Sequence, residues 1–302
     1  MDYELIVIGA GPGGCSAALY GAREGLTTLL VEPAAPGGQM SVTAWVENYP
    51  GVPGASGQDL ANAMLAGAKA AGATFLQAQV TGLHLTGSPK IVETTRGAYT
   101  AGAVVLAMGA APRKLALPEA ERFLGRGLSY CATCDGMFYR GKTVVVVGGG
   151  NTAVSDVLYL SRLCEKVYLV HRRDTLRASK VYLDPLQKAE NVEFVWDSEV
   201  KQLLRDQAVT GVRVRNKKTG EERDIPCDGV FVAVGYLPNT ELYRGQVELD
   251  EAGYVLADET TQTNLPGVFA VGDLRKKPLR QVVTAASDGA VAAHFIEEYL
   301  NQ

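Results

Sequence analysis

The chain has 302 residues, of which 47% are hydrophobic, so it is long enough for two domain cores of ordinary size. Its 29 basic and 33 acidic side chains give a net charge of −4, which argues against general affinity for nucleic acid or for an anionic membrane. The apolar stretches fall short of the roughly 20 residues that span a bilayer, and the first residues lack the basic start and cleavage site of a secretory signal. We therefore expect a cytoplasmic protein with two domains.

The N-terminal segment has the pattern of a dinucleotide-binding unit. An apolar run at residues 5–8 is typical of a buried parallel strand and leads into Gly9, Gly11 and Gly14 in the spacing G-x-G-x-x-G, before a helical stretch over residues 15–24. Such a turn lets the backbone approach a pyrophosphate, whose charge is held by N–H groups at the positive end of the helix. An isolated match is also compatible with a tight turn that binds nothing.

The same pattern occurs a second time further along the chain. An apolar run at residues 143–147 leads into Gly148 and Gly150, and a helical stretch follows. In each copy the next strand ends 23 residues after the first glycine, at Glu32 in the first and at His171 in the second. Duplication at constant spacing predicts an α/β fold with two Rossmann-like, three-layer, nucleotide-binding domains.

The far ends of the two copies also correspond. Residues 104–112 and 230–238 each contain a buried strand followed by glycine and proline, and they are offset by 126 residues. After the second copy comes another buried strand at residues 267–273 and a helical run, a segment too short to fold alone. We expect it to complete the first domain, although the pattern also allows it to join the second. The predicted domains are residues 1–113 with 243–302, and residues 114–242.

The residue that closes the second strand of each copy discriminates between nucleotides. Glu32 can accept hydrogen bonds from a free ribose 2′-hydroxyl and would repel a 2′-phosphate, which suits the adenosine of FAD. His171, Arg172 and Arg173 stand at the same place in the second copy, with Arg177 close behind. Because arginine binds phosphate oxygens in a bidentate manner, this cluster predicts NADP(H). The alternative is an ordinary solvated basic turn.

Two of the five cysteines, Cys131 and Cys134, have the spacing C-x-x-C, at which a disulfide can close and reopen. Zinc needs about four ligands, and the sequence offers no second pair, so we favour a redox disulfide and expect no metal. Asp135 follows directly and suits a turn and also the proton transfer that thiol release requires, two roles that are compatible. The remaining cysteines are expected to be buried small hydrophobes: Cys15, Cys164 and Cys227.

Together these motifs resemble those of low-molecular-weight, bacterial-type thioredoxin reductases, which belong to the pyridine nucleotide-disulfide oxidoreductases. The resemblance covers the whole chain and rests on these segments, in order: residues 9–14, Gly-Gly-Gln-Met at 37–40, Glu-Asn-Tyr-Pro-Gly at 47–51, Cys-Ala-Thr-Cys-Asp-Gly at 131–136, Gly-Gly-Gly-Asn-Thr-Ala at 148–153, His-Arg-Arg-Asp at 171–174, residues 267–273 and Arg280-Gln281. One departure concerns Ser155, which precedes Asp156 where the family often has acidic residues, and this leaves the nicotinamide position open.

The resemblance implies a specific set of site residues. Cys131, Cys134 and Asp135 would be catalytic. FAD would be bound by Gly9, Gly11, Pro12, Gly14, Glu32, Gln39, Asn48, Val80, Gly109, Gly272, Asp273, Arg280, Gln281 and Val282. NADPH would be bound by Gly148, Gly150, Asn151, Thr152, His171, Arg172, Arg173 and Arg177.

The resemblance also implies an activity and partners. Electrons would pass from NADPH through FAD and the cysteine pair to thioredoxin or a thioredoxin-like protein, one domain would rotate on the joints near Pro112 and Pro238, and the protein would be a homodimer. Three alternatives stay open: a peroxiredoxin-type partner, a different electron donor, and a non-catalytic NADPH sensor.

Overall fold

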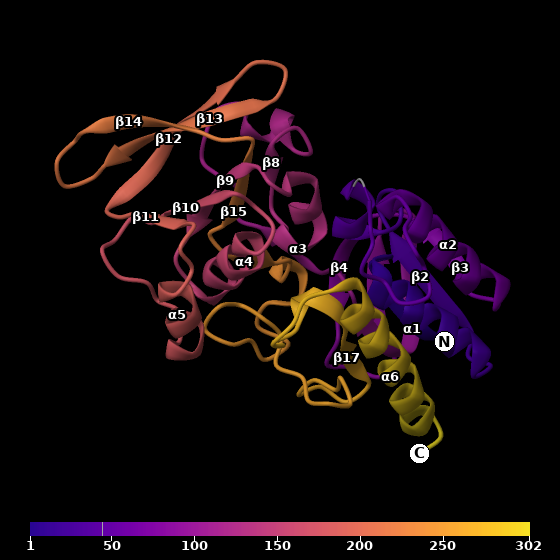
Figure 1. Ribbon diagram of the computed structural model, residues 1–302. Coiled ribbons are helices and arrows are strands. Elements are labelled where there is room, and N and C mark those ends of the chain that lie inside the picture. The colour runs from indigo at the N-terminus through magenta and orange to yellow at the C-terminus, as the bar shows by residue number, and fades with distance from the viewer. Residues whose placement is uncertain (44) are drawn as a thin grey trace. The chain divides into compact units, whose positions relative to one another are not determined.

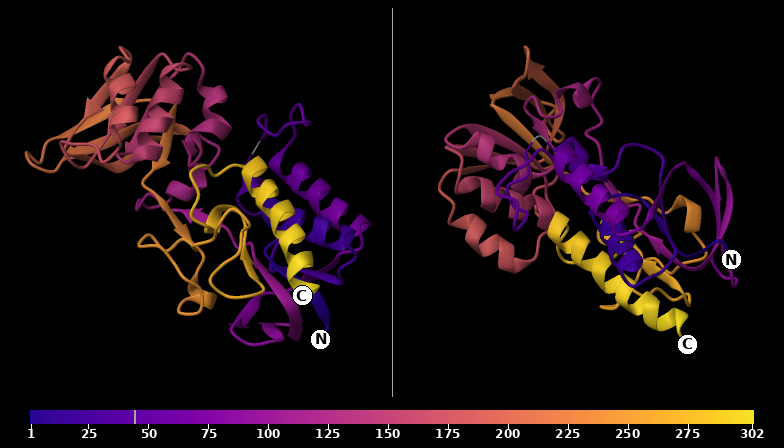
Figure 2. Two further views of the ribbon diagram at one scale, coloured as in Figure 1. Left: turned by 90° about the horizontal axis from the view of Figure 1, so that it is seen from below. Right: turned by 90° about the vertical axis from the view of Figure 1, so that its right-hand side faces the viewer.

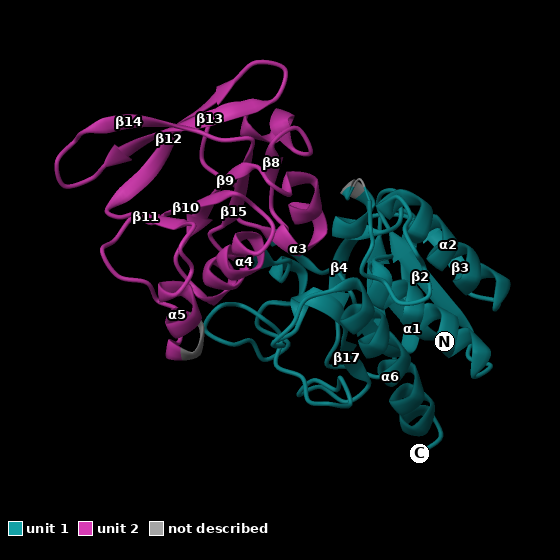
Figure 3. Cartoon of the chain, in the orientation of Figure 1, with its two compact units in different colours: residues 1–111, 237–302 teal, residues 112–236 magenta. Residues whose placement is uncertain are grey.

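The computed structural model describes residues 1–43 and 45–302, apart from the side chains of residues 42, 181 and 182. The chain divides into two compact units (Figure 3). Unit 1 comprises Met1–Ala111 with Leu237–Gln302, and unit 2 comprises Pro112–Tyr236. The expectation that the first domain is discontinuous is therefore confirmed. Where the chain passes from one unit to the other, strand β7 (Ala110–Pro112) pairs with β16 (Tyr236–Pro238).

Unit 1 contains a seven-stranded sheet in which parallel and antiparallel parts meet at one long strand, β6. The order is β3-β2-β1-β6-β5-β4, with β17 paired to the end of β6. Strands β1, β2, β3, β6 and β17 are parallel, whereas β4, β5 and β6 form an antiparallel meander. The strands are β1 (Tyr3–Ile8), β2 (Thr28–Glu32), β3 (Thr74–Gln77), β4 (Val80–His84), β5 (Lys90–Thr94), β6 (Gly97–Leu106) and β17 (Val268–Ala270).

Both faces of this sheet are covered, which explains why β1 is apolar throughout rather than alternating. Leu5 and Val7 pack beneath the helices α1 (Pro12–Arg23), α2 (Gly57–Ala70) and α6 (Val282–Leu300), whereas Ile6 and Ile8 pack in the core on the opposite face. Helix α6 lies beside α1 although it ends the chain (Figures 1 and 2), and the Ser16 hydroxyl donates a 2.7 Å hydrogen bond to the Ala286 carbonyl. Short 3-10 turns complete the unit: η1 (Gly38–Val42), η4 (Glu241–Tyr243) and η5 (Gly272–Leu274).

Unit 2 has a five-stranded parallel sheet and a separate three-stranded antiparallel sheet. The parallel sheet has the order β11-β10-β9-β15-β8 and consists of β8 (Leu128–Ser129), β9 (Thr143–Gly148), β10 (Lys166–Val170), β11 (Val192–Val195) and β15 (Gly229–Ala233). The antiparallel sheet consists of β12 (Ser198–Arg205), β13 (Val209–Asn216) and β14 (Glu222–Pro226). The helices and 3-10 turns are η2 (Ala120–Phe123), α3 (Ala132–Asp135), η3 (Gly136–Tyr139), α4 (Asn151–Ser161) and α5 (Lys180–Gln187).

The duplicated pattern of the sequence corresponds to a duplicated arrangement of strands, as predicted. In unit 1 the parallel order is β3-β2-β1-β6-β17, and in unit 2 it is β11-β10-β9-β15-β8. The fifth strand differs in origin, because β8 precedes the second glycine motif whereas β17 comes from the C-terminal segment. That pairing, with Val268 opposite Val104, is what makes unit 1 discontinuous. Among the described residues, no helix is both long and apolar enough to cross a bilayer.

Candidate functional site

The first glycine turn of unit 1 requires glycine for a steric reason. Gly9 has a φ of +105°, and a Cβ atom there would lie 2.5 Å from the Ala107 carbonyl oxygen of the neighbouring strand end. Gly11 is the N-cap of α1, Pro12 is the first helical residue, and a Cβ atom on Gly11 would meet no atom within 4 Å. The turn is therefore packed tightly on its inner side and open at the N-terminus of α1, the arrangement that admits an anionic group.

The carboxylate of Glu32 is fixed beside this turn. It accepts a 2.8 Å hydrogen bond from the Ala10 N–H through Oε2 and a 3.3 Å bond from the Ala34 N–H through Oε1. The Ala10 carbonyl accepts a 2.8 Å bond from Gly37, which brings η1, and with it the predicted residue Gln39, to the same turn. The acidic group thus stands at the end of β2, where a ribose hydroxyl would need an acceptor.

Further predicted residues of unit 1 gather at the start of α6. The Asn48 amide donates a 2.9 Å hydrogen bond to Gln281 Oε1, and Arg280 donates a 3.4 Å bond to the Asp273 carbonyl while its guanidinium lies 4.1 Å from the centre of the Tyr254 ring. Asp273 Oδ1 is buried without a hydrogen-bond partner among the described residues, and burial raises the pKa of this carboxyl. A buried acceptor of this kind fits the hydroxyl groups of a bound flavin side chain.

Asp288 holds this segment in place through a buried charge cluster that sequence reasoning missed. It binds Arg275 Nη1 at 3.1 Å and Lys277 Nζ at 2.7 Å, and it accepts a 2.9 Å bond from the Gly272 N–H. The three charged side chains are between 6% and 12% exposed, so solvent screens their interactions weakly. The cluster therefore fixes the backbone that presents Asp273.

The remaining predicted flavin residues of unit 1 occupy varied positions. Gly14 is buried in α1, Val80 is buried at the start of β4, and Gly109 follows β6 with a φ of +63°. Val282 is the first residue of α6. Gly14 and Val282 therefore lie on the two helices that border the glycine turn, whereas no contact tests a ligand role for Val80 or Gly109.

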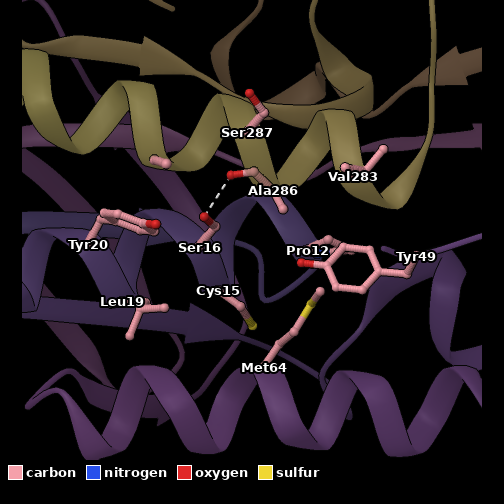
Figure 4. Close-up of a pocket in the computed structure, with 11 residues that line it drawn as sticks. Pro12, Cys15, Ser16, Leu19, Tyr20, Tyr49, Met64, Val283, Ala286 and Ser287 are labelled. Atoms are coloured by element: carbon pink, nitrogen blue, oxygen red, sulfur yellow. Dashed lines mark hydrogen bonds between the residues drawn. The ribbon is translucent and has the colours of Figure 1, made fainter. Parts of the chain in front are cut away.

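Unit 1 also has a pocket of about 380 Å³ between α1, α2 and α6 (Figure 4). Tyr20 and Val283, which are 43% and 40% exposed, lie on its rim. Burial raises the pKa of the Cys15 thiol to about 12, so this side chain is neutral and unreactive. The pocket is lined by Pro12, Cys15, Ser16, Leu19, Tyr20, Tyr49, Met64, Val283, Ala286, Ser287 and Ala290. Because no lining residue carries a formal charge, the pocket suits apolar side chains rather than a phosphate.

In unit 2 the predicted arginine cluster lies against the second glycine turn. The N–H of Arg177 donates a 2.7 Å bond to the Gly149 carbonyl, and the N–H of Ser179 donates a 2.9 Å bond to Asn151 Oδ1. Residues 171–179 therefore fold back over the start of α4.

The predicted NADPH residues around this turn are largely exposed. The side chains of Arg172, Arg173 and Arg177 are exposed there, as are those of Asn151 and Thr152. Gly148 ends β9, and Gly150 is the N-cap of α4.

His171 behaves differently from its arginine neighbours, because it is 8% exposed and forms part of the wall behind the turn. A Cβ atom on Gly149 would lie 2.1 Å from the His171 ring, so only glycine lets the turn pass over it. The Trp196 ring lies edge-on to the imidazole with centroids 6.4 Å apart. Burial lowers the pKa of His171, which favours a neutral ring, and its Nε2 has no partner among the described residues.

The cysteine pair is closed as a disulfide. Cys131 is the N-cap of α3 and Cys134 lies within it, with their Cα atoms 5.3 Å apart. Both are half-buried, and burial raises the pKa of the adjacent Asp135 carboxyl. The other cysteines are buried thiols, as predicted, and burial raises their pKa values to about 12 for Cys15, 11 for Cys164 and 12 for Cys227. Thiol chemistry is therefore concentrated at Cys131 and Cys134.

Two dinucleotide folds, one of which carries a closed C-x-x-C disulfide, define a nucleotide-dependent disulfide oxidoreductase. The family described as pyridine nucleotide-disulphide oxidoreductase matches residues 3–289, and the chain belongs to this family. Its chemistry uses a flavin and a pyridine nucleotide.

Known relatives match the chain over nearly its full length. A thioredoxin reductase of Listeria monocytogenes is 44% identical over 99% of this chain and 94% of its own. The crystal structure of a thioredoxin reductase from Streptococcus pyogenes is 41% identical with a TM-score of 0.90, covering 99% of this chain and 98% of its own. A thioredoxin reductase structure from Giardia duodenalis is 34% identical with a TM-score of 0.92, covering 99% of both chains.

Replacing Asp288 by asparagine tests the buried charge cluster. Because Asp288→Asn leaves Arg275 and Lys277 buried without their counter-charge, we expect the free energy of unfolding to fall by about 3 kcal/mol or more. We also expect the flavin to be lost more readily on dialysis. Urea unfolding and the absorbance of retained flavin measure the two effects.

The matched control is Glu93→Gln, which alters an exposed 3.2 Å contact with His84 and should change stability by less than about 1 kcal/mol. Equal stability and equal flavin retention in Asp288→Asn and the wild-type protein would show that the cluster does not support the site.

Proposed function

We propose that this chain is a cytoplasmic thioredoxin reductase that transfers two electrons from NADPH through FAD and the Cys131–Cys134 disulfide to thioredoxin or a thioredoxin-like protein. The observation that carries the proposal is the closed disulfide in unit 2, the unit that also contains the arginine-flanked glycine turn. Unit 1 contains the glycine turn with Glu32. One nucleotide fold is thus suited to FAD and the other to NADPH. The domain limits predicted from the sequence, residues 1–113 with 243–302 and residues 114–242, differ from the limits of the two units by two residues at the first joint and six at the second.

The residues of unit 1 fit FAD at two separated points. Glu32, fixed beside the glycine turn, would accept hydrogen bonds from the adenosine ribose, and the N–H groups at the start of α1 would hold the pyrophosphate. Asp273 Oδ1, which has no partner among the described residues, would accept a hydrogen bond from the hydroxyl chain of the flavin. Bound FAD would supply the redox chemistry that links hydride transfer from the nucleotide to reduction of the disulfide. The other residues of the predicted FAD set would line the same ligand.

The NADPH assignment rests on the arginines of unit 2. Arg172, Arg173 and Arg177 are exposed on a loop that the Arg177 N–H ties to the glycine turn. Their guanidinium groups would bind a 2′-phosphate, and Gly148, Gly150, Asn151 and Thr152 would surround the pyrophosphate. His171 would support the turn from behind as a neutral wall residue. The presence of this arginine cluster favours NADPH over a different electron donor.

The half-buried disulfide suits exchange with a protein partner. Met137 and Phe138 follow the pair and are 42% and 50% exposed, so a partner that presents apolar residues around its own disulfide would bury both. Asp135 would exchange protons with the thiols during the reaction. Two exposed apolar side chains beside a redox pair favour an enzyme over an NADPH sensor.

We further propose that the protein is a homodimer and that the two units rotate on β7 and β16 during the cycle. Exposed apolar side chains on the rim of the pocket between α1 and α6 provide a surface that a second copy would cover. Rotation follows from the chemistry, because nicotinamide and disulfide both belong to unit 2 and would have to reach the flavin in turn.

Replacing both arginines, as Arg172→Leu with Arg173→Leu, tests the nucleotide assignment. Loss of charge-assisted bonds to the 2′-phosphate should raise the KM for NADPH by about 10- to 100-fold, whereas the KM for NADH should stay within about threefold. Steady-state kinetics with both nucleotides measures the effect. Arg162→Leu, an exposed arginine at the end of α4, is the matched control. Equal losses with NADPH and NADH would refute the assignment.

Replacing both cysteines, as Cys131→Ala with Cys134→Ala, tests the activity itself. NADPH-dependent reduction of thioredoxin should fall by more than about 100-fold, because the pair is the route to the partner. Flavin content and the rate at which NADPH bleaches the flavin should be preserved, which separates this effect from misfolding. Unchanged thioredoxin reduction would disprove the proposed function, and Cys164→Ala is the control for a buried thiol.

A further inference from the structure

Ser129 lies directly before the redox segment and is only 2% exposed. It ends β8, a two-residue strand that pairs with β15 of the parallel sheet, where Ser129 stands opposite Phe231. The sheet therefore fixes the backbone of Ser129, and its hydroxyl has a limited choice of partners. A hydroxyl this deeply buried needs hydrogen bonds.

That hydroxyl connects the first cysteine to the neighbouring acid. Ser129 Oγ accepts a 3.0 Å hydrogen bond from the Cys131 N–H and lies 2.6 Å from Asp135 Oδ2. The Cys131 carbonyl is a second possible acceptor, at 3.3 Å. A hydroxyl has one hydrogen to donate, and the shorter, charge-assisted bond to the carboxylate is the stronger of the two. Ser129 therefore joins the backbone at Cys131 to the side chain of Asp135.

We infer that Ser129 is a positioning residue for the dithiol–disulfide exchange, whose hydroxyl orients the Asp135 carboxyl group toward the redox pair and controls when that group carries a proton. This inference rests on the proposed function and assigns a role to a residue that lies outside the Cys-Ala-Thr-Cys-Asp-Gly motif at 131–136. Serine suits the position because its hydroxyl can accept one bond while donating another.

The exchange needs a proton at a defined place. A thiolate of the reduced pair attacks the partner disulfide, the partner S–S bond breaks, and the released partner sulfur takes the proton of Asp135. The second thiol of the pair then gives its proton to Asp135 and attacks the mixed disulfide, which restores the Cys131–Cys134 bond. The second partner sulfur leaves with that proton, so two electrons and two protons reach the partner and Asp135 ends ionised.

The surroundings of Asp135 make this proton sensitive to Ser129. Burial raises the pKa of Asp135, and the hydrogen bond from Ser129 lowers it. Among the described residues, Tyr139 senses the charge of Asp135: burial, and then that charge, raise the pKa of Tyr139 to about 12. Helix α4 packs against α3 and brings Tyr159 against Gly136, and burial raises the pKa of Asp156 on the same helix to about 7. Removing the hydroxyl therefore removes a contact that favours the ionised carboxylate.

The test uses pre-reduced holoenzyme mixed with oxidised thioredoxin in single turnover across a range of pH. In the wild-type protein the rate should fall as pH rises and Asp135 loses its proton. In Ser129→Ala the limiting rate at low pH should fall by about tenfold, because the carboxyl group is no longer held in position. The midpoint of the pH profile should move up by about one pH unit, because the carboxylate has lost its donor. Ser129→Thr keeps the hydroxyl and should restore the wild-type midpoint. Ser161→Ala on α4 is the matched control and should change neither quantity.

A double-variant cycle separates positioning from a structural effect. Asp135→Asn should abolish the pH-dependent limb, and adding Ser129→Ala to it should cause no further change. An unmoved midpoint in Ser129→Ala, or an equal rate loss with and without Asp135, would overturn the inference while the proposed function stands. A wild-type profile in Asp135→Asn would remove the acid on which the inference rests, and loss of thioredoxin reduction in the wild-type protein would refute the proposed function itself.

Discussion

A disulfide can be opened and re-formed many times only if its two sulfur atoms stay close in the reduced state, and the fold meets this constraint with a single turn of helix. Helix α3 keeps the Cα atoms of Cys131 and Cys134 5.3 Å apart, and β8 anchors the chain just before it. Because the parallel sheet holds β8 and the start of α4, the disulfide and the second glycine turn belong to one compact unit. The proposed chemistry depends on this attachment.

Buried polar groups divide into two kinds in this structure. Asp288 is satisfied by two cations and a backbone N–H, and it supports the segment that precedes α6. Among the described residues five buried side-chain atoms have no partner, and two of these, Asp273 Oδ1 and His171 Nε2, lie beside the glycine turns, whereas the others belong to Tyr243, Thr261 and Arg275. Because an unpaired buried polar atom costs stability, these two atoms beside the glycine turns indicate ligand binding more strongly than the paired groups do. They occur where the sequence predicts a flavin and a nicotinamide nucleotide.

Most of the architecture could be predicted from the sequence because its signals are local. Apolar runs that end in glycine predicted β1 and β9, and the repeated spacing predicted the shared strand order. The sequence pattern predicts a helix from residue 15, whereas α1 begins at Pro12, because Gly13 and Gly14 are helical rather than part of the turn. The partners of Asp288 and the inward position of His171 were not predictable, since both depend on which strands and helices pack together. Ser129 lies two residues before the recognised motif at 131–136, and only the structure shows its contact with Asp135.

The most direct measurement of the central claim is an anaerobic titration of the holoenzyme with dithionite, followed by flavin absorbance and by labelling of free thiols. If electrons pass from the flavin into the disulfide, complete reduction of the wild-type chain will consume about twice the dithionite needed by a chain without the two cysteines, and thiols will appear at Cys131 and Cys134. Equal consumption by both proteins, with the disulfide still closed when the flavin is fully reduced, would contradict the account.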